Sequence, residues 1–261
     1  LGTIGCNFHC EHCQNWHISQ QTLEMEALRD LAPEQGVERA IRSGCASIAW
    51  TYNEPTIWHE YPLAMGTLAR EKGLGTVYVT NGYITEVGLR ELSPMLNAFR
   101  VDIKSFSDTF YRKVCGGRLQ PVLDATALAK ELGMHVETVT LVIPGQNDSM
   151  DEMETLIRWV LDTLGPDTPM HFTRFHPDYR MLEVRPTAIR TLEKIYERAK
   201  ELGLHYPYLG NVGGHPYEST YCPTCGSLAI ERSGYAVRIR GLDDHTCTEC
   251  GGRIEYVSKI D

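Results

Sequence analysis

The sequence predicts an α/β fold of parallel strands alternating with helices, followed by a small four-cysteine module. As far as about residue 210, short runs rich in Val, Ile and aromatic residues alternate with amphipathic stretches. The runs lack clean polar alternation, as expected for strands covered on both faces. The alternation of predicted strands with predicted helices indicates a parallel sheet, closed as a barrel or left open. Beyond Gly210 the composition changes to Gly, Pro, Tyr and His and then to two CxxC pairs.

Seven runs are predicted to be strands because they are short, apolar and bounded by turn residues. They span residues 1–5, 46–52, 76–80, 98–103, 135–142, 170–175 and 205–209.

Helices are predicted in the gaps between these strands, at residues 33–44, 121–133, 149–164, 186–202 and in one stretch after residue 56. Ser149 followed by Glu152 is typical of a capping box at a helix start. Gly203 is expected to end the helix before it. Pro62 interrupts the helix that follows Thr56, so we expect a kink there.

The domain organisation follows from the change in composition. A chain of 261 residues can bury one large core and still carry a small module. We predict a strand–helix domain over residues 1–214 and a four-cysteine module over residues 215–261.

The charge and the apolar pattern exclude some classes of partner. A net charge of −9 disfavours a long nucleic-acid backbone as partner, because such binding needs clustered Lys and Arg. No apolar run approaches the about 18 residues of a membrane-spanning helix, and no secretory leader opens the chain. The first residue is Leu1 rather than Met, so we expect an upstream piece to be missing. Nine cysteines without an export signal indicate metal binding in a reducing cytoplasm.

Three cysteines near the start have the spacing C-x3-C-x2-C: Cys6, Cys10 and Cys13. A 4Fe–4S cubane takes one cysteine thiolate per iron, so three cysteines leave one iron open to a small molecule. The alternatives are a three-cysteine zinc site completed by His9 or His12, or chance clustering.

Four cysteines near the end form two CxxC pairs separated by 21 residues: Cys222, Cys225, Cys247 and Cys250. Four thiolates fit tetrahedral zinc in a structural site, although a rubredoxin-like iron would use the same ligands. The tail holds five basic and seven acidic residues from Glu218 onward, which disfavours a nucleic-acid-binding ribbon. The remaining two cysteines, Cys45 and Cys115, are each expected to be small core residues.

The opening cysteine motif resembles that of the radical S-adenosylmethionine (SAM) enzymes. The resemblance implies a partial parallel (β/α)6-type barrel whose open iron binds the amino and carboxylate groups of SAM. It further implies reductive cleavage of SAM to methionine and a 5′-deoxyadenosyl radical.

The ends of the predicted strands add further matches to this family. The segment 51–55 is similar to its Gly-Gly-Glu-Pro element with two substitutions, which implies that Asn53 and Glu54 lie at the methionyl amino group, partly through main-chain carbonyls. Segments 80–82 and 102–104 resemble the Thr-Asn-Gly turn and Asp-x-Lys strand of glycyl-radical activating enzymes. The matching residues are Thr80, Asn81, Asp102 and Lys104.

Asp102 and Lys104 lie on the same face of a predicted strand. In one interpretation the Lys104 ammonium binds the SAM carboxylate, and in the other the two residues form a structural ion pair. Pro144 matches the family's turn beneath the adenine, and His176 matches a SAM-contacting histidine or is structural. Val79 stands where activating enzymes carry an acidic residue of a cation site, so that cation is not expected here.

The strongest resemblance is to the radical SAM proteins of the AmmeMemoRadiSam system, which are activase-like and resemble pyruvate formate-lyase activating enzymes. It rests on the segments 5–8, 13–19, 52–56, 174–177 and 210–212. It implies an oxygen-sensitive cytoplasmic oxidoreductase with a flavodoxin or ferredoxin as electron donor, and Memo-like and AMMECR-type proteins as partners.

Three functions are compatible with these observations. The enzyme abstracts hydrogen from a small molecule or a protein residue, or it activates a glycyl-radical enzyme by acting on a glycine of that partner. The third possibility is a metal-binding scaffold without catalysis, which would not need SAM-matching residues at successive strand ends.

Overall fold

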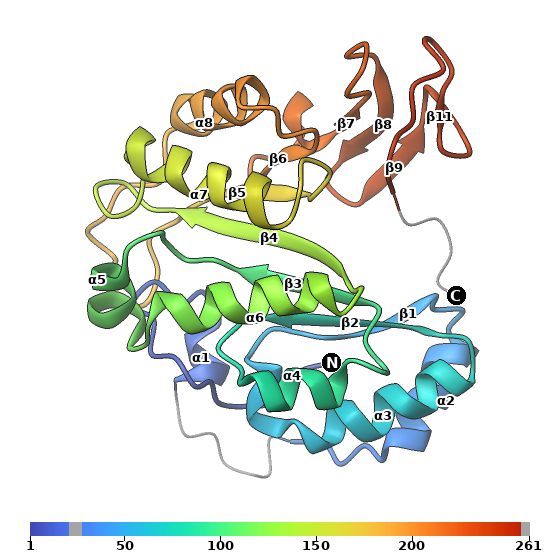
Figure 1. Cartoon of the computed structure of the whole chain (residues 1–261). Coiled ribbons are helices and arrows are strands. Elements are labelled where there is room, and N and C mark those ends of the chain that lie inside the picture. The colour runs from blue at the N-terminus through green and yellow to red at the C-terminus, as the bar shows by residue number, and fades with distance from the viewer. Residues whose placement is uncertain (21–27, 257–261) are drawn as a thin grey trace. The chain divides into compact units, whose positions relative to one another are not determined.

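The computed structural model of the chain describes residues 1–20 and 28–256. Within these ranges, six strands form one parallel sheet in the order β1-β2-β3-β4-β5-β6, as the predicted α/β class requires (Figure 1). The chain divides into two compact units, and β4 (His135–Val142) contains the division.

The first unit contains Leu1–Glu137 and Asp178–Leu182. Its strands are β1 (Ser47–Trp50), β2 (Gly75–Thr80) and β3 (Ala98–Asp102), and its longer helices are α2 (Pro33–Arg42), α3 (Glu60–Glu71), α4 (Glu86–Leu92) and α6 (Leu119–Glu131). Helix α3 packs against β1 and β2, while α6 packs against β3. The core between them is aromatic, since Trp50, Tyr78 and Phe99 are fully buried.

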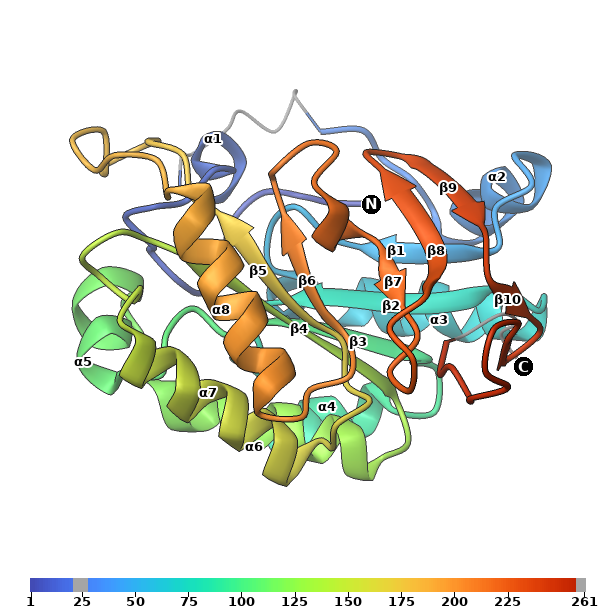
Figure 2. The same ribbon diagram turned by 90° about the horizontal axis from the view of Figure 1, so that it is seen from above.

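The second unit contains Thr138–Pro177 and the described residues from Glu183 onward. Its elements are α7 (Met150–Thr163), β5 (Met170–Arg174), α8 (Ile189–Glu201), β6 (Pro207–Gly210) and the short 3₁₀ helix η4 (Pro216–Glu218). Helix α8 runs beside β5 and β6 (Figure 2).

The four-cysteine segment of the second unit is built from short antiparallel strands. They are β7 (Thr220–Tyr221), β8 (Leu228–Ser233) and β9 (Ala236–Ile239), and the pair β10 (Leu242–Asp243) and β11 (Thr246–Cys247). Cys222 and Cys247 share a small buried core with Tyr206, which directly precedes β6. The predicted domain boundary between residues 214 and 215 therefore separates residues that belong to one hydrophobic cluster.

The prediction of a strand over residues 1–5 was wrong. The backbone begins as one, because the Leu1 amino group donates to Ala49 O at 2.6 Å and Leu1 O accepts from Thr51 N at 2.8 Å. The amide of Thr3 then donates to the side chain of Asn53 at 2.9 Å, and Gly5 adopts φ +92°. The side chain of Asn53 thus accepts the hydrogen bond that a backbone carbonyl would accept in a β-sheet, and the strand-like pairing ends there.

The expected kink at Pro62 does not occur. A 3₁₀ helix, η2 (Pro55–Trp58), comes first, and α3 begins at Glu60. Pro62 therefore lies in the first turn of α3, where a backbone N–H has no intrahelical acceptor and proline costs nothing.

Three short helical segments had no clear sequence signal: α1 (Trp16–Ser19), α5 (Asp108–Phe110) and the π-helix η3 (Tyr111–Cys115). The prediction for Cys45 was also wrong, because its side chain is exposed, whereas Cys115 is buried as expected. Cys45 follows Gly44 in the turn after α2, where the chain runs over the surface.

Candidate functional site

The loop that carries Cys6, Cys10 and Cys13 lies between Gly5 and α1 and is fixed to η3. His9 N donates to Cys115 O at 2.8 Å, and Glu11 N donates to Val114 O at 3.0 Å. The ring of Phe8 is 1% exposed and packs against Tyr83 and Tyr111. A buried aromatic anchor and two backbone bonds therefore hold a loop that has no regular secondary structure.

Two of the three thiols of this loop, those of Cys6 and Cys13, have polar groups close to them. Phe8 N lies 3.4 Å from Cys6 Sγ, and Asn81 Nδ2 lies 3.7 Å from the same sulfur. Cys13 Sγ lies 3.1 Å from the hydroxyl of Ser19. Donors directed at sulfur stabilise thiolates, which are the form that binds iron. The assignment of all three thiols to one cubane rests on their spacing along the loop.

Glu54 is a buried carboxylate whose oxygens accept hydrogen bonds from three neighbouring residues. Oε1 accepts from Thr56 N at 3.0 Å, Thr56 Oγ1 at 2.6 Å and Thr80 Oγ1 at 2.7 Å. Oε2 accepts from Asn81 N at 2.7 Å. Burial raises the pKa of Glu54, and these hydrogen bonds oppose that shift. The side chain therefore joins the end of β1 to the end of β2.

The two predicted asparagines connect these strand ends to the cysteine loop. Asn53 accepts from Thr3 N at 2.9 Å and donates to Gly5 O at 3.1 Å. Asn81 donates to Asn7 Oδ1 at 2.8 Å, in addition to its approach to Cys6. Thus Asn53, Glu54, Thr80 and Asn81 form one continuous network with the loop. Asn7 is a member of this network that the sequence did not single out for any role.

Asp102 and Lys104 form a partly buried ion pair, with Lys104 Nζ 2.8 Å from Asp102 Oδ2. Arg100 approaches the other carboxylate oxygen at 3.6 Å. Burial opposes ionisation of Asp102, but the charges of Lys104 and Arg100 hold its pKa below the usual value. Burial would likewise lower the pKa of Lys104, yet Asp102 and the neighbouring Cys10 thiol raise it overall. Both side chains are therefore charged at neutral pH.

The remaining two candidates, Pro144 and His176, lie in the second unit. Pro144 is part of a turn that Asn147 closes, because Ile143 N donates to Asn147 Oδ1 at 2.6 Å and Asn147 Nδ2 donates to Leu141 O at 2.9 Å. His176 is exposed and lies two residues after the end of β5. Their roles toward SAM remain predictions.

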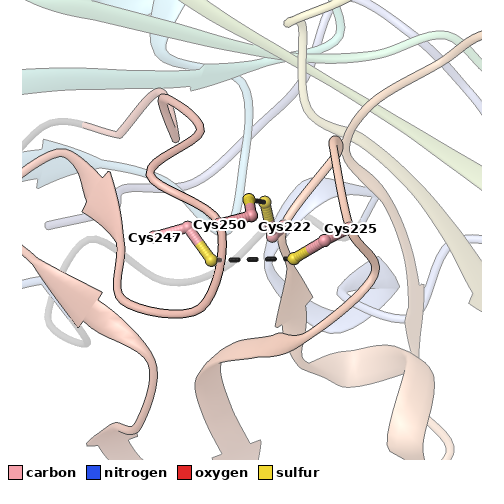
Figure 3. A group of neighbouring side chains, drawn as sticks. All are labelled: Cys222, Cys225, Cys247 and Cys250. Atoms are coloured by element: carbon pink, nitrogen blue, oxygen red, sulfur yellow. Dashed lines mark hydrogen bonds between the residues drawn. The ribbon is translucent and has the colours of Figure 1, made fainter.

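The four C-terminal thiols converge on one point (Figure 3). All four sulfurs lie within 4.8 Å of one another, with Cys222 and Cys250 separated by 3.7 Å and Cys225 and Cys247 by 3.8 Å. Four thiolates about 2.3 Å from a single tetrahedral ion lie about 3.8 Å apart. The structure therefore brings the four predicted cysteines together in a geometry that fits one tetrahedral metal ion. Zinc and iron fit it equally well.

Comparison with known proteins identifies the family. Residues 1–160 match the family model described as "Radical SAM superfamily". An uncharacterized protein of Methanocaldococcus jannaschii is 47% identical over 259 residues, covering 98% of this chain and 77% of that protein.

Two solved structures share the fold at low sequence identity. One is a domain of the pyruvate-formate lyase-activating enzyme of Bacteroides vulgatus, with a TM-score of 0.56 and 12% identity over 64% of this chain and 99% of that one. The other is SuiB of Streptococcus suis bound to S-adenosylmethionine, with a TM-score of 0.64 and 10% identity over 80% of this chain and 49% of that one.

The structure also bears on disulfide bonds and on membrane-spanning helices. All nine cysteines are free thiols. In the described parts of the chain, every helix is too short or too polar to span a bilayer.

Proposed function

Because the chain belongs to the radical SAM superfamily, we propose that it cleaves S-adenosylmethionine reductively at a 4Fe–4S cluster held by Cys6, Cys10 and Cys13. Family membership implies an enzyme that uses this cluster and SAM, and it removes the scaffold without catalysis from the candidate functions. The observation that carries the assignment of ligands is the C-x3-C-x2-C loop, in which Cys6 lies near two N–H donors and Cys13 near the Ser19 hydroxyl. The bound cofactors supply the electron and the 5′-deoxyadenosyl radical that abstracts hydrogen from a substrate.

The protein's own groups hold the loop and present charge near it. The network around Glu54 fixes Asn81 against Cys6. We assign the main chain of segment 52–54 to the methionyl amino group, with Tyr52 O already accepting from Asn15 Nδ2 at 2.8 Å. Lys104 is the partly buried ammonium that we assign to the methionyl carboxylate, with Asp102 as its counter-ion. Pro144 and His176 complete our set of SAM contacts from the second unit.

Reduction of anaerobically reconstituted protein in the presence of SAM tests this function. We expect 5′-deoxyadenosine and methionine in equal amounts, and a cluster content of one 4Fe–4S per chain. A protein that holds the cluster but releases neither product would contradict the proposal.

Activation of a glycyl-radical enzyme is the second candidate. It is favoured by Thr80-Asn81 and by the pair Asp102 and Lys104, which resemble the SAM-binding motifs of activating enzymes. Its test is an electron paramagnetic resonance spectrum of a glycyl-radical protein after incubation with the reduced enzyme and SAM. A glycyl signal that requires both would support this candidate, and hydrogen transfer to a small molecule alone would exclude it.

We also propose zinc at Cys222, Cys225, Cys247 and Cys250, a flavodoxin or ferredoxin as electron donor, and Memo-like and AMMECR-type proteins as partners. A reducing cytoplasm suits both metal sites, since both need thiolates that are not oxidised to disulfides. Metal analysis of air-exposed protein distinguishes zinc from iron at the four-cysteine site.

A further inference from the structure

Arg232 in β8 is a partly buried cation that the residues at the start of β7 hold in place. Its backbone N–H donates to Ser219 Oγ at 3.1 Å, and its guanidinium Nη1 donates to Thr220 Oγ1 at 2.6 Å. Ser219 and Thr220 are both 4% exposed, so the two acceptors are buried. Arg232 is therefore fixed at its backbone and at its guanidinium.

The guanidinium of Arg232 lies over an aromatic stack on the large sheet. Its Cζ is 5.5 Å from the centre of the Tyr208 ring, which stacks on the His171 ring at 5.0 Å. His171 in β5 is the register partner of Tyr208 in β6, so both side chains point to the same face. Met170 and Phe172 flank His171 on the other face and are fully buried. Stacking occupies the face of a guanidinium, and its N–H edge is the part that forms hydrogen bonds.

Arg232 has no counter-ion in the described parts of the chain. Within residues 1–20 and 28–256, Thr220 is the acceptor of its guanidinium, and no carboxylate forms an ion pair with it. Glu231 points to the other face of β8 and pairs with Arg240 at 2.7 Å. A guanidinium carries five N–H donors, and removing its charge from water without a partner costs free energy. This partly buried, unpaired charge is the observation that indicates a bound anion.

We propose that Arg232 binds a small oxyanion, a carboxylate or phosphate group, through the guanidinium N–H groups that Thr220 does not use. The planar guanidinium matches both groups with two parallel hydrogen bonds. The chain has a net charge of −9, so it repels anions in general and recognition at Arg232 has to be local. The inference goes beyond the proposed function and does not rest on it, because its residues all lie in the second unit and the proposed cluster ligands lie in the first.

The test is a titration of the full chain with inorganic phosphate and, separately, with acetate, at an ionic strength held constant with chloride. Nuclear magnetic resonance of the backbone amides at positions 220 and 232 follows binding. We expect a saturable shift with at least one of the two anions. Arg232→Gln should weaken that binding about ten- to a hundredfold, the effect of one hydrogen bond between charged groups. Arg232→Lys keeps the charge without the fork, so its affinity should lie between the two.

Arg238→Gln is the matched control, because Arg238 is exposed on the neighbouring strand β9 and should not affect binding. Saturation by phosphate alone identifies a phosphate site, and saturation by acetate alone identifies a carboxylate site. Saturation by neither anion, or equal affinities in the wild type and Arg232→Gln, would overturn the proposal. If Arg232→Gln does not fold, Arg232→Lys decides, and an affinity equal to that of the wild type contradicts the guanidinium contact.

Discussion

Glu54 and its hydrogen-bond donors decide whether the cysteine loop keeps its position. The carboxylate accepts from Thr56, Thr80 and Asn81, and Asn81 in turn approaches Cys6. A side chain whose oxygens already accept four hydrogen bonds within the protein acts on SAM by positioning the residues around it.

Glu54→Gln should therefore lower the free energy of unfolding by about 1–3 kcal/mol, because one amide N–H₂ then faces a backbone donor. Chemical denaturation of the metal-free protein measures this. Glu131→Gln is the control, since Glu131 is exposed at the end of α6 and should change stability little. A stable Glu54→Gln variant would mean that the four hydrogen bonds do not hold the strand ends together.

Lys104 allows a second test at the scale of single residues. If its ammonium binds the methionyl carboxylate, Lys104→Ala weakens SAM binding about ten- to a hundredfold on cluster-loaded protein, from the roughly 1.5–3 kcal/mol of a charged hydrogen bond. Val79→Ala should leave the affinity unchanged, because we expect no cation site at Val79.

The ion pair at 2.8 Å makes a double variant necessary, because Lys104→Ala also removes the closest counter-ion of the partly buried Asp102 and leaves Arg100 at 3.6 Å. Asp102→Asn combined with Lys104→Met removes both charges and keeps the shape of the site. Weak SAM binding in this double variant supports the carboxylate contact. Binding as tight as in the wild type would leave Asp102 and Lys104 as a structural pair.

At the scale of elements, the start of α7 and the bounds of β4 were predictable because their signals are local. Ser149 Oγ accepts from Glu152 N at 3.3 Å, as the capping pattern predicts. Ser149→Ala should cost about 1 kcal/mol of stability in thermal or chemical unfolding. Ser43→Ala, at the exposed C-terminal end of α2, should lower the stability clearly less, because the Ser43 side chain does not cap the helix. Equal losses of stability in the two variants would show that the Ser149 cap contributes nothing.

The four-cysteine segment packs against Tyr206, the residue that directly precedes β6. Cys222 and Cys247 share a core with Tyr206, whose hydroxyl accepts from Glu255 N at 2.8 Å and whose carbonyl accepts from Met170 N at 3.0 Å. Loss of the metal should therefore loosen the edge of the large sheet as well as the small segment.

Hydrogen exchange after removal of the metal tests this coupling, and the amide of Met170 should exchange faster. A truncation ending near His215 should lose the zinc and expose Tyr206, which is 3% exposed in the intact chain. That truncation should be less stable than Cys225→Ser, whose altered residue is an exposed ligand. Zinc retained by the truncated chain would show that the ligand assignment is wrong.

For the whole molecule, the sequence predicted the parallel sheet and the residues at its strand ends, because parallel strands bring their carboxyl ends to one edge. Glu54, Thr80 and Asn81 are joined in the structure as that rule implies. The backbone bond from His9 N to Cys115 O could not be predicted, since the two residues are distant in sequence and no periodic pattern links them. The side chain of Asn53 ended the expected first strand in the same way, through a contact that local propensity does not encode.

The function that we propose requires that Cys6, Cys10 and Cys13, and no other cysteines, hold the catalytic cluster. Cys6→Ala, Cys10→Ala and Cys13→Ala should each abolish both the cluster signal and the release of 5′-deoxyadenosine from SAM, because each leaves a further iron without a ligand. Cys45→Ala is the matched control, since Cys45 is exposed and lies outside both cysteine groups.

Anaerobic SAM cleavage by these four variants and the wild type, measured side by side, tests the account most directly. We predict 5′-deoxyadenosine from the wild type and Cys45→Ala and none from the other three. Normal release of 5′-deoxyadenosine by Cys6→Ala, Cys10→Ala or Cys13→Ala would contradict it.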